Sequence, residues 1–153
     1  MNWDYKQAIK RCGARIGRED YLMFLIHPDV PAYTHAINDK PVVVFNSQWI
    51  DQSLFTQIMV HELGHVVLGH YKIKRSTVPD DVALAMELLC DKISEYGCNA
   101  IGAPFNGKAT TYMAREATAE TWQYVKERDG LARSAAQRIV DAGLQEGQHA
   151  TVR

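Results

Sequence analysis

The stretch His61-Glu62-Leu63-Gly64-His65 sets two histidines four residues apart inside a long run that alternates apolar and polar residues with a helical period. Four residues are about one helical turn, so both imidazoles project from one face and can bind one ion. Glu62 is displaced by one position, where its carboxylate can take a proton from a water molecule beside that ion. The stretch therefore predicts the helix of a zinc hydrolase, with His61 and His65 as metal ligands and Glu62 as the catalytic base.

A hydrolytic zinc site needs a third protein ligand and keeps one position open for water. The next predicted helix carries Glu87 and Asp91, again four residues apart and so on one face. We expect Glu87 to be the third ligand and Asp91 to accept the outward N–H of one ligand histidine, although the sequence does not say which one. The short linker between the helices favours an antiparallel pair. Three nearby carboxylates compete with Glu87 for the ligand position: Asp80, Asp81 and Glu95.

His70 is the rival third ligand. One class of zinc proteases has the pattern H-E-x-x-H-x-x-G-x-x-H, and here Gly69 and His70 each miss that register by one residue, in opposite directions. His70 is five residues after His65, about 140° around a helix, so a helix that continues to about Tyr71 keeps it away from the ion. Only a break at Gly69 would change this expectation.

Length and composition fit one soluble globular domain. The chain has 153 residues, of which 46% are hydrophobic and 23% charged, so we expect a single domain over residues 1–144 and a frayed tail over 145–153. The formal net charge of -1 gives no reason to expect nucleic acid or an anionic membrane as a partner. Oligomeric state cannot be inferred from these features.

Three further features favour a cytoplasmic location. The segment from Met1 to Lys6 lacks the apolar core of a signal peptide. No stretch approaches the roughly 18 apolar residues of a membrane span. Cys12, Cys90 and Cys98 are an odd number without C-x-x-C spacing, which is typical of reduced thiols; we expect Cys90 to face the core.

The remaining patterns predict an α+β fold, with a small antiparallel sheet packed on a helical bundle. Val42 to Phe45 is the clearest strand, and it can be an edge strand that aligns an extended substrate. We expect Gly64 to let a strand pack close to the metal-binding face, and Gly97 to end the second site helix. The predicted strands are 21–26, 32–37 and 42–45, and the predicted helices are about 4–16, 51–71, 82–96, 111–128 and 131–142.

Two parts of the chain together resemble the ImmA/IrrE family of metallopeptidases. The first part is Val42–Asn46 followed by Met59–His70, which matches the family's strand ending in Asn, a spacer and a helix with H-E-L-G-H followed by aliphatic residues. The second is Glu87–Asp91, which matches the family's E-x-x-x-D/N pattern. The resemblance covers about residues 20 to 100. Lys92–Tyr96 departs from the A-x-x-F-A-like run that usually follows in the family.

The resemblance implies a minimal zincin-like fold of the gluzincin class, with Zn²⁺ as the cofactor. It also implies a place on a phage or mobile element and a helix-turn-helix repressor as the protein partner, which is cleaved or inactivated. This chain has no helix-turn-helix pattern of its own, so any DNA contact would belong to the partner. The oxyanion-stabilising group stays open among Tyr96, Tyr112 and His35.

Two other functions remain open from the sequence. The domain can be a zinc-binding module that inactivates a repressor or toxin by docking, without hydrolysis. It can also be a component of a toxin–antitoxin or anti-restriction system, which only the neighbouring gene would reveal. The presence of Glu62 favours the peptidase, because a purely structural zinc site is normally closed by four protein ligands.

Overall fold

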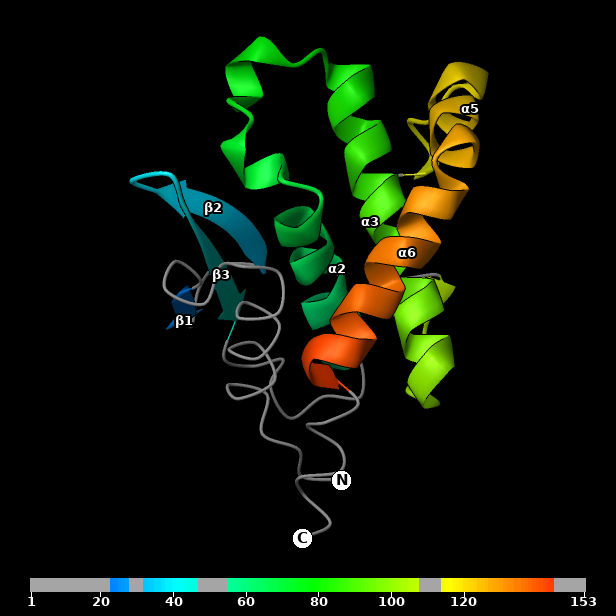
Figure 1. Cartoon of the computed structure of the whole chain (residues 1–153). Helices are drawn as coiled ribbons and strands as arrows, with labels where there is room; N and C mark the ends of the chain where they lie inside the picture. Colours follow the sequence, from blue (N-terminus) through cyan, green and yellow to red (C-terminus); the bar gives the residue numbers. More distant parts are fainter. Residues whose placement is uncertain (1–22, 28–31, 47–54, 108–113, 145–153) are drawn as a thin grey trace, which may run out of the picture.

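The computed structural model describes residues 23–27, 32–46, 55–107 and 114–144. Within these ranges a small sheet lies on one side of helix α2, and α3, α5 and α6 lie on the other side (Figure 1). The predicted α+β class, with an antiparallel strand pair beside packed helices, is confirmed. The expected first helix, Tyr112 and the expected tail over 145–153 lie outside the described residues.

The sheet has the strand order β1-β3-β2. β2 (Tyr33–Ile37) and β3 (Lys40–Asn46) form an antiparallel hairpin, and β1 (Met23–His27) pairs with β3 in parallel. Asn38 and Asp39 form the two-residue turn with φ angles of 53° and 64°, as hairpin turns of this length require.

The expectation that Val42 to Phe45 is an edge strand is wrong, because β3 has a partner on each side. Val42, Val43 and Val44 are almost fully buried, which suits a central strand. In the described sheet, the edge strand that packs against α2 is β2.

Helix α2 (Phe55–Val67) buries an apolar face at intervals of three or four residues, and its buried members include Phe55, Met59, Leu63 and Val66. The expectation that this helix continues to Tyr71 is wrong. Gly69 adopts a left-handed conformation with φ of 74°, and the chain turns into the short 3-10 helix η2 (His70–Lys72).

A second 3-10 turn, η3 (Arg75–Thr77), leads into helix α3 (Asp80–Ile101). The predicted end of this helix at Gly97 is wrong, because α3 continues until Gly102 caps it in the left-handed conformation. Gly97 lies instead where α2 crosses: a Cβ at this position would be 3.0 Å from Cγ1 of Val60. The glycine therefore allows the two site helices to approach closely.

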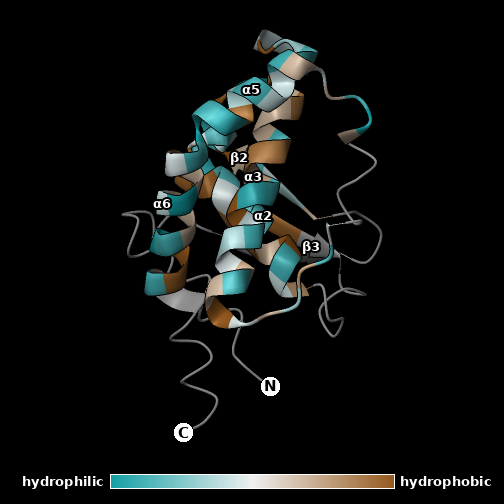
Figure 2. Ribbon diagram, turned by 90° about the vertical axis from the view of Figure 1, so that its right-hand side faces the viewer, coloured by the Kyte–Doolittle hydropathy of each residue, from teal (hydrophilic) through white to brown (hydrophobic). Residues whose placement is uncertain are grey.

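Helices α5 (Ala119–Glu127) and α6 (Asp129–Ile139) cover the other side of α3, and a π-helical turn, η5 (Val140–Leu144), follows. The helix expected over about 111–128 is interrupted: Ala114 is helical, residues 115–118 are not, and α5 begins after Thr118, whose hydroxyl accepts a hydrogen bond from the backbone N–H of Thr121. Hydrophilic residues of α5 and α6 face outward (Figure 2). None of the helices in the described ranges is long and apolar enough to cross a membrane.

Candidate metal centre

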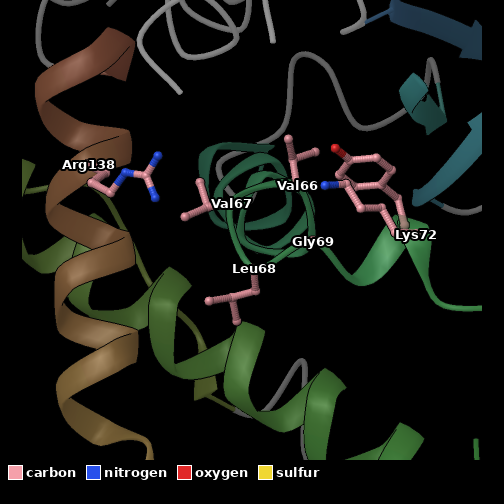
Figure 3. A pocket seen from close by; sticks show the side chains of 7 residues that line it. Val66, Val67, Leu68, Gly69, Lys72 and Arg138 are labelled. Atoms are coloured by element: carbon pink, nitrogen blue, oxygen red, sulfur yellow. The ribbon is translucent and has the colours of Figure 1, made fainter. Parts of the chain in front are cut away.

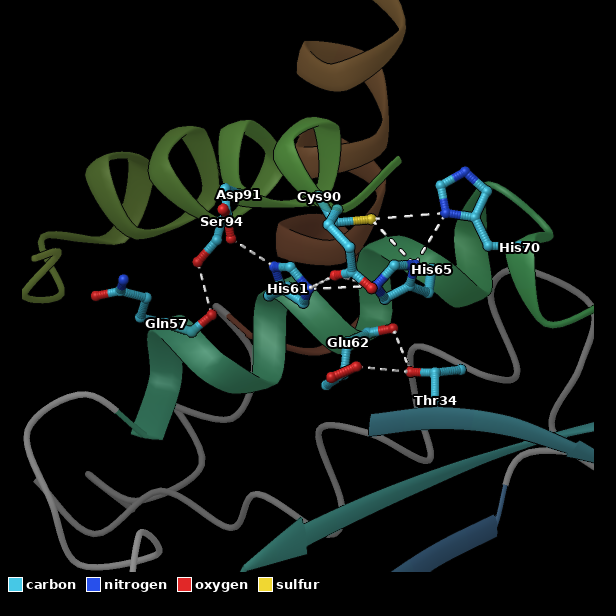
Figure 4. Close-up of polar contacts among 10 residues, drawn as sticks. Thr34, Gln57, His61, Glu62, His65, His70, Cys90, Asp91 and Ser94 are labelled. Carbon is cyan, nitrogen blue, oxygen red and sulfur yellow. Dashed lines mark hydrogen bonds and ion pairs between the residues drawn. The ribbon is translucent and has the colours of Figure 1, made fainter. Parts of the chain in front are cut away.

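Three donor atoms from α2 and α3 converge on one point (Figure 4). Nε2 of His61 lies 2.9 Å from Oε2 of Glu87, and Nε2 of His65 lies 3.2 Å from the same oxygen. The two Nε2 atoms lie 3.2 Å from each other. We call His61, His65 and Glu87 the carboxylate cluster. The sequence predicted this set, and the antiparallel crossing of the two helices brings it together.

The spacing and chemistry of the carboxylate cluster fit a zinc ion. Zinc binds nitrogen and oxygen ligands at about 2.0–2.2 Å, so neighbouring donors of a tetrahedral site are separated by about 3.3 Å. The three separations given above lie within a few tenths of an ångström of that value. Two histidines and one glutamate are also a ligand set of hydrolytic rather than structural zinc sites.

Asp91 orients His61, the histidine that the sequence alone could not select. Its Oδ1 lies 2.7 Å from Nδ1 of His61, which leaves Nε2 directed at the cluster. The second oxygen, Oδ2, is buried and has no hydrogen-bond partner among the described residues.

The charge distribution at the carboxylate cluster favours a cation. Burial lowers the pKa of His61, but its contacts with Asp91 and Glu87 outweigh burial and raise that pKa to about 10. Burial raises the pKa of Glu87, but its contacts with His61 and His65 outweigh burial and hold the pKa well below its usual range. Glu87 is therefore a carboxylate ready to bind a cation.

Glu62 lies beside this cluster and is 4% exposed. Donor atoms of His61, Glu62 and His65 all lie within 4.8 Å of one another. Burial raises the pKa of Glu62, although the charges of His61 and His65 lower it in part. A carboxyl group with a raised pKa holds a proton more readily than an ordinary carboxylate, which suits a group that accepts a proton and then returns it.

Thr34 of β2 holds Glu62 from the sheet side, a role that the sequence did not reveal. Its Oγ1 lies 3.0 Å from the backbone oxygen of Glu62 and 3.2 Å from the Oε1 atom of Glu62. The available signal was alternation: Thr34 and Ala36 are half-buried, whereas Tyr33, His35 and Ile37 are exposed. The sequence did not show which strand packs on the H-E-x-x-H helix.

The other nitrogen of His65 faces a different group of side chains. Nδ1 of His65 lies 2.9 Å from Nδ1 of His70 and 3.4 Å from Sγ of Cys90. His70 therefore approaches His65 from behind, because the turn at Gly69 folds η2 back. Burial and, to a smaller extent, the charge of His65 lower the pKa of His70 to about 4, so its ring is neutral. Cys90 is fully buried, and burial raises the pKa of its thiol.

Gly64 allows α3, rather than the expected strand, to pack against this face of α2. A Cβ at Gly64 would lie 3.2 Å from Cδ1 of Ile93 and 3.3 Å from Sγ of Cys90. The glycine at this position of the motif therefore makes room for the thiol.

Two of the carboxylates that competed with Glu87 have their own cationic partners. Asp80 pairs with Arg75 at 2.7 Å, and Glu95 pairs with Lys92 at 3.5 Å. Asp81 is exposed in the first turn of α3.

Two of the three oxyanion candidates can be placed in the structure. The Tyr96 hydroxyl donates a hydrogen bond to Asp129 of α6. His35 lies on the face of β2 opposite Thr34, so it points away from Glu62. Neither is placed to contact a substrate carbonyl at Glu62, and Tyr112 lies outside the described residues.

A hollow of about 280 Å³ lies around the end of α2 (Figure 3). Arg138 and Lys72 line opposite sides of it, and the other lining residues are Val66, Val67, Leu68, Gly69 and Tyr71. None of the carboxylate cluster residues lines this hollow. The positive charges of Arg138 and Lys72 lie near the C-terminal end of α2, where they interact favourably with the negative end of the helix dipole.

Comparison with known proteins adds no relative from which a function can be transferred. No family model, no curated protein and no solved structure matches this chain.

Proposed function

We propose that this protein is a zinc-dependent endopeptidase whose substrate is a protein, and that this substrate is a helix-turn-helix repressor, as the ImmA/IrrE resemblance implies. The observation that carries the proposal is the carboxylate cluster, three donor atoms no more than 3.2 Å apart with the buried carboxyl of Glu62 beside them. A structural zinc site would normally be closed by a fourth protein ligand, and it would have no use for a general base.

His61, His65 and Glu87 would hold the ion. Bound there, zinc supplies a Lewis acid that lowers the pKa of water toward about 7 and polarises the scissile carbonyl. Asp91 supports this role because it fixes the ring of His61 through the 2.7 Å contact with Nδ1.

Glu62 is the proton carrier in this proposal. It accepts a proton from the attacking water and returns it to the leaving amine as the peptide C–N bond breaks. Catalysis of this kind contributes roughly 10²- to 10⁴-fold. The contact with Thr34 restricts where the carboxyl group can lie, and the raised pKa of Glu62 matches a group that is protonated and deprotonated in each cycle.

The edge strand β2 is the proposed support for the substrate. An extended peptide that adds to a sheet edge is held by backbone hydrogen bonds and is therefore accepted with many different side chains. Because Thr34 lies on β2 and contacts Glu62, a peptide paired with this edge would pass close to the carboxyl group. β2 thus takes the substrate-aligning role that the sequence pattern suggested for Val42 to Phe45, which lie in the central strand β3.

The decisive experiment is Glu62→Gln, tested on each helix-turn-helix protein that the neighbouring genes encode. We expect the variant to bind zinc as the parent does and to cleave the repressor roughly 10²- to 10⁴-fold more slowly. Intact-mass measurement of the repressor reports cleavage, and metal analysis of the purified variant reports zinc.

Glu95→Gln is the matched control, because Glu95 lies on α3 in an ion pair with Lys92 and away from the carboxylate cluster. This variant should cleave the repressor at the parental rate. Cleavage by Glu62→Gln at the parental rate would exclude the mechanism. Release of repression with an intact repressor would favour the docking function instead.

A further inference from the structure

A second set of three donor atoms lies on the far side of the His65 ring (Figure 4). Nδ1 of His65, Nδ1 of His70 and Sγ of Cys90 are separated by 2.9, 3.4 and 3.8 Å. They come from three elements, α2, η2 and α3. We call His65, His70 and Cys90 the thiol cluster. It shares one residue with the carboxylate cluster and uses the opposite nitrogen of that residue.

The spacing of the thiol cluster also fits one ion. Zinc-like ions bind nitrogen at about 2.0–2.1 Å and sulfur at about 2.3 Å, which separates tetrahedral donors by about 3.3 Å for two nitrogens and about 3.6 Å for nitrogen and sulfur. The two nitrogen–sulfur separations differ from this value by about 0.2 Å each, and the nitrogen–nitrogen separation is shorter because the two rings are within hydrogen-bonding distance. The largest misfit, about 0.4 Å, equals that of the carboxylate cluster.

Two glycines build the thiol cluster. The left-handed turn at Gly69 directs His70 back toward α2, and in the described part of the chain a Cβ at Gly69 would contact no residue beyond its two chain neighbours within 4 Å. The missing side chain of Gly64 leaves the space that Sγ of Cys90 occupies. A side chain at Gly64 would lie too close to Sγ of Cys90, and loss of the left-handed turn at Gly69 would move His70 away from the cluster.

We propose that the thiol cluster is a second metal-binding position, selective for thiophilic d¹⁰ cations such as Cu⁺ and Cd²⁺. Two imidazoles and one thiolate are a soft donor set, whereas the carboxylate cluster replaces the sulfur with a hard oxygen. The two positions therefore differ in the ions that they select.

The two positions also exclude each other. An ion on Nδ1 of His65 requires the remaining ring proton to be on Nε2, and Nε2 then has no lone pair for the carboxylate cluster. Binding releases one proton, from the thiol of Cys90. The consequence, inhibition of hydrolysis by a thiophilic ion, rests on the proposed peptidase function, but the binding does not.

The test uses the full chain with Cys12 and Cys98 both replaced by Ser, so that Cys90 is the only thiol. Titration with Cd²⁺ under reducing conditions should produce the ultraviolet charge-transfer absorption of a thiolate–cadmium bond, saturating at one ion per chain. Adding Cys90→Ser should abolish the band. Adding His70→Gln should weaken binding at least about tenfold, the lower range seen even for indirect supports of metal sites.

His61→Ala separates this proposal from the proposed function. It removes a donor of the carboxylate cluster only, so the charge-transfer band should persist while zinc hydrolysis is lost. A folded single-thiol protein without the band, or a band that survives Cys90→Ser, would overturn the second position. An unchanged Cd²⁺ affinity in His70→Gln would also overturn it. If Cd²⁺ gives the band yet leaves repressor cleavage unaffected, the mutual exclusion is wrong.

Discussion

Helix α3 has two packed faces, and they differ in chemistry. Toward α2, the buried side chains include the polar Gln57, His65 and Ser94, and toward α6 they include Ala132, Ala135, Ala136 and Ile139. Buried polar groups destabilise a fold unless they are hydrogen-bonded, so the polar face must be fully connected. It largely is: Ser94 donates to the backbone oxygen of Gln57, and Gln57 makes two hydrogen bonds with the backbone of Asn106.

The two faces of α3 therefore have different roles. The face toward α6 mainly stabilises the fold, and the face toward α2 carries the metal-binding side chains. Substitutions facing α6 should change the free energy of unfolding and leave metal binding unchanged. Substitutions facing α2 should change metal binding or proton transfer more than stability. The following predictions test this division.

Ile139→Ala should have the largest effect on stability. Ile139 is fully buried in α6, and removal of a buried isoleucine side chain typically costs about 2 to 5 kcal/mol. Denaturant unfolding measures the loss, with Leu131→Ala as the control because Leu131 is 51% exposed in the same helix. Zinc affinity of the folded variant should equal that of the parent, and a parallel loss of affinity would break the division between the two faces.

Asp91→Asn, on the face of α3 toward α2, should lower zinc affinity rather than stability. Without the carboxylate behind His61, zinc affinity should fall by roughly 10- to 100-fold, equivalent to about 1.4 to 2.7 kcal/mol. Competition with a chromophoric chelator measures the affinity. If Asp91→Asn binds zinc as tightly as Glu95→Gln, on the same helix, then Asp91 does not support the site.

The carboxylate cluster could be predicted because it depends on helical periodicity alone. His61, His65 and Glu87 need only two helices that face each other, and Asp91 follows Glu87 by one turn. The α+β class followed in the same way from local patterns. What the sequence did not provide was the pairing of distant strands: β3 is central because β1 reaches it in parallel, and no local pattern records that choice.

The helix ends were missed because glycine has two opposite uses in this chain. Gly64 and Gly97 stay helical, and a Cβ at either would meet a side chain of the facing helix at 3.0 to 3.3 Å. Gly69 and Gly102 end their helices, and among the described residues a Cβ there would meet nothing within 4 Å beyond its chain neighbours. Packing across the helix pair therefore decides which glycine ends a helix, and sequence alone does not show that packing. The position of His70 depends on this distinction.

The pH dependence of the metal-free protein offers a third test. The pKa of His61 is raised from 6.5 to about 10 in the folded state, so its contribution to stability is complete below pH 6.5 and is lost as pH rises toward about 10. The free energy of unfolding of the parent, relative to His61→Gln, should fall across this window by at least about 1 kcal/mol. Unfolding curves in chelator measure it. A difference that stays constant or grows with pH would contradict the charge distribution proposed for the cluster.

Two threonines give the finest comparison, because each makes one local set of contacts and only one of them faces the site. Thr118→Ala removes the cap of α5 and should cost about 1 kcal/mol of stability, with no change in the pH dependence of cleavage. Thr34→Val removes the hydroxyl that lowers the pKa of Glu62, so that pKa should rise and the acidic limb of the cleavage profile should move to higher pH. If both variants leave the profile unchanged, Thr34 merely packs β2 on α2. A shift in Thr118→Ala as well would show that general loosening of the fold reaches Glu62, and the separation of the two faces of α3 would then fail.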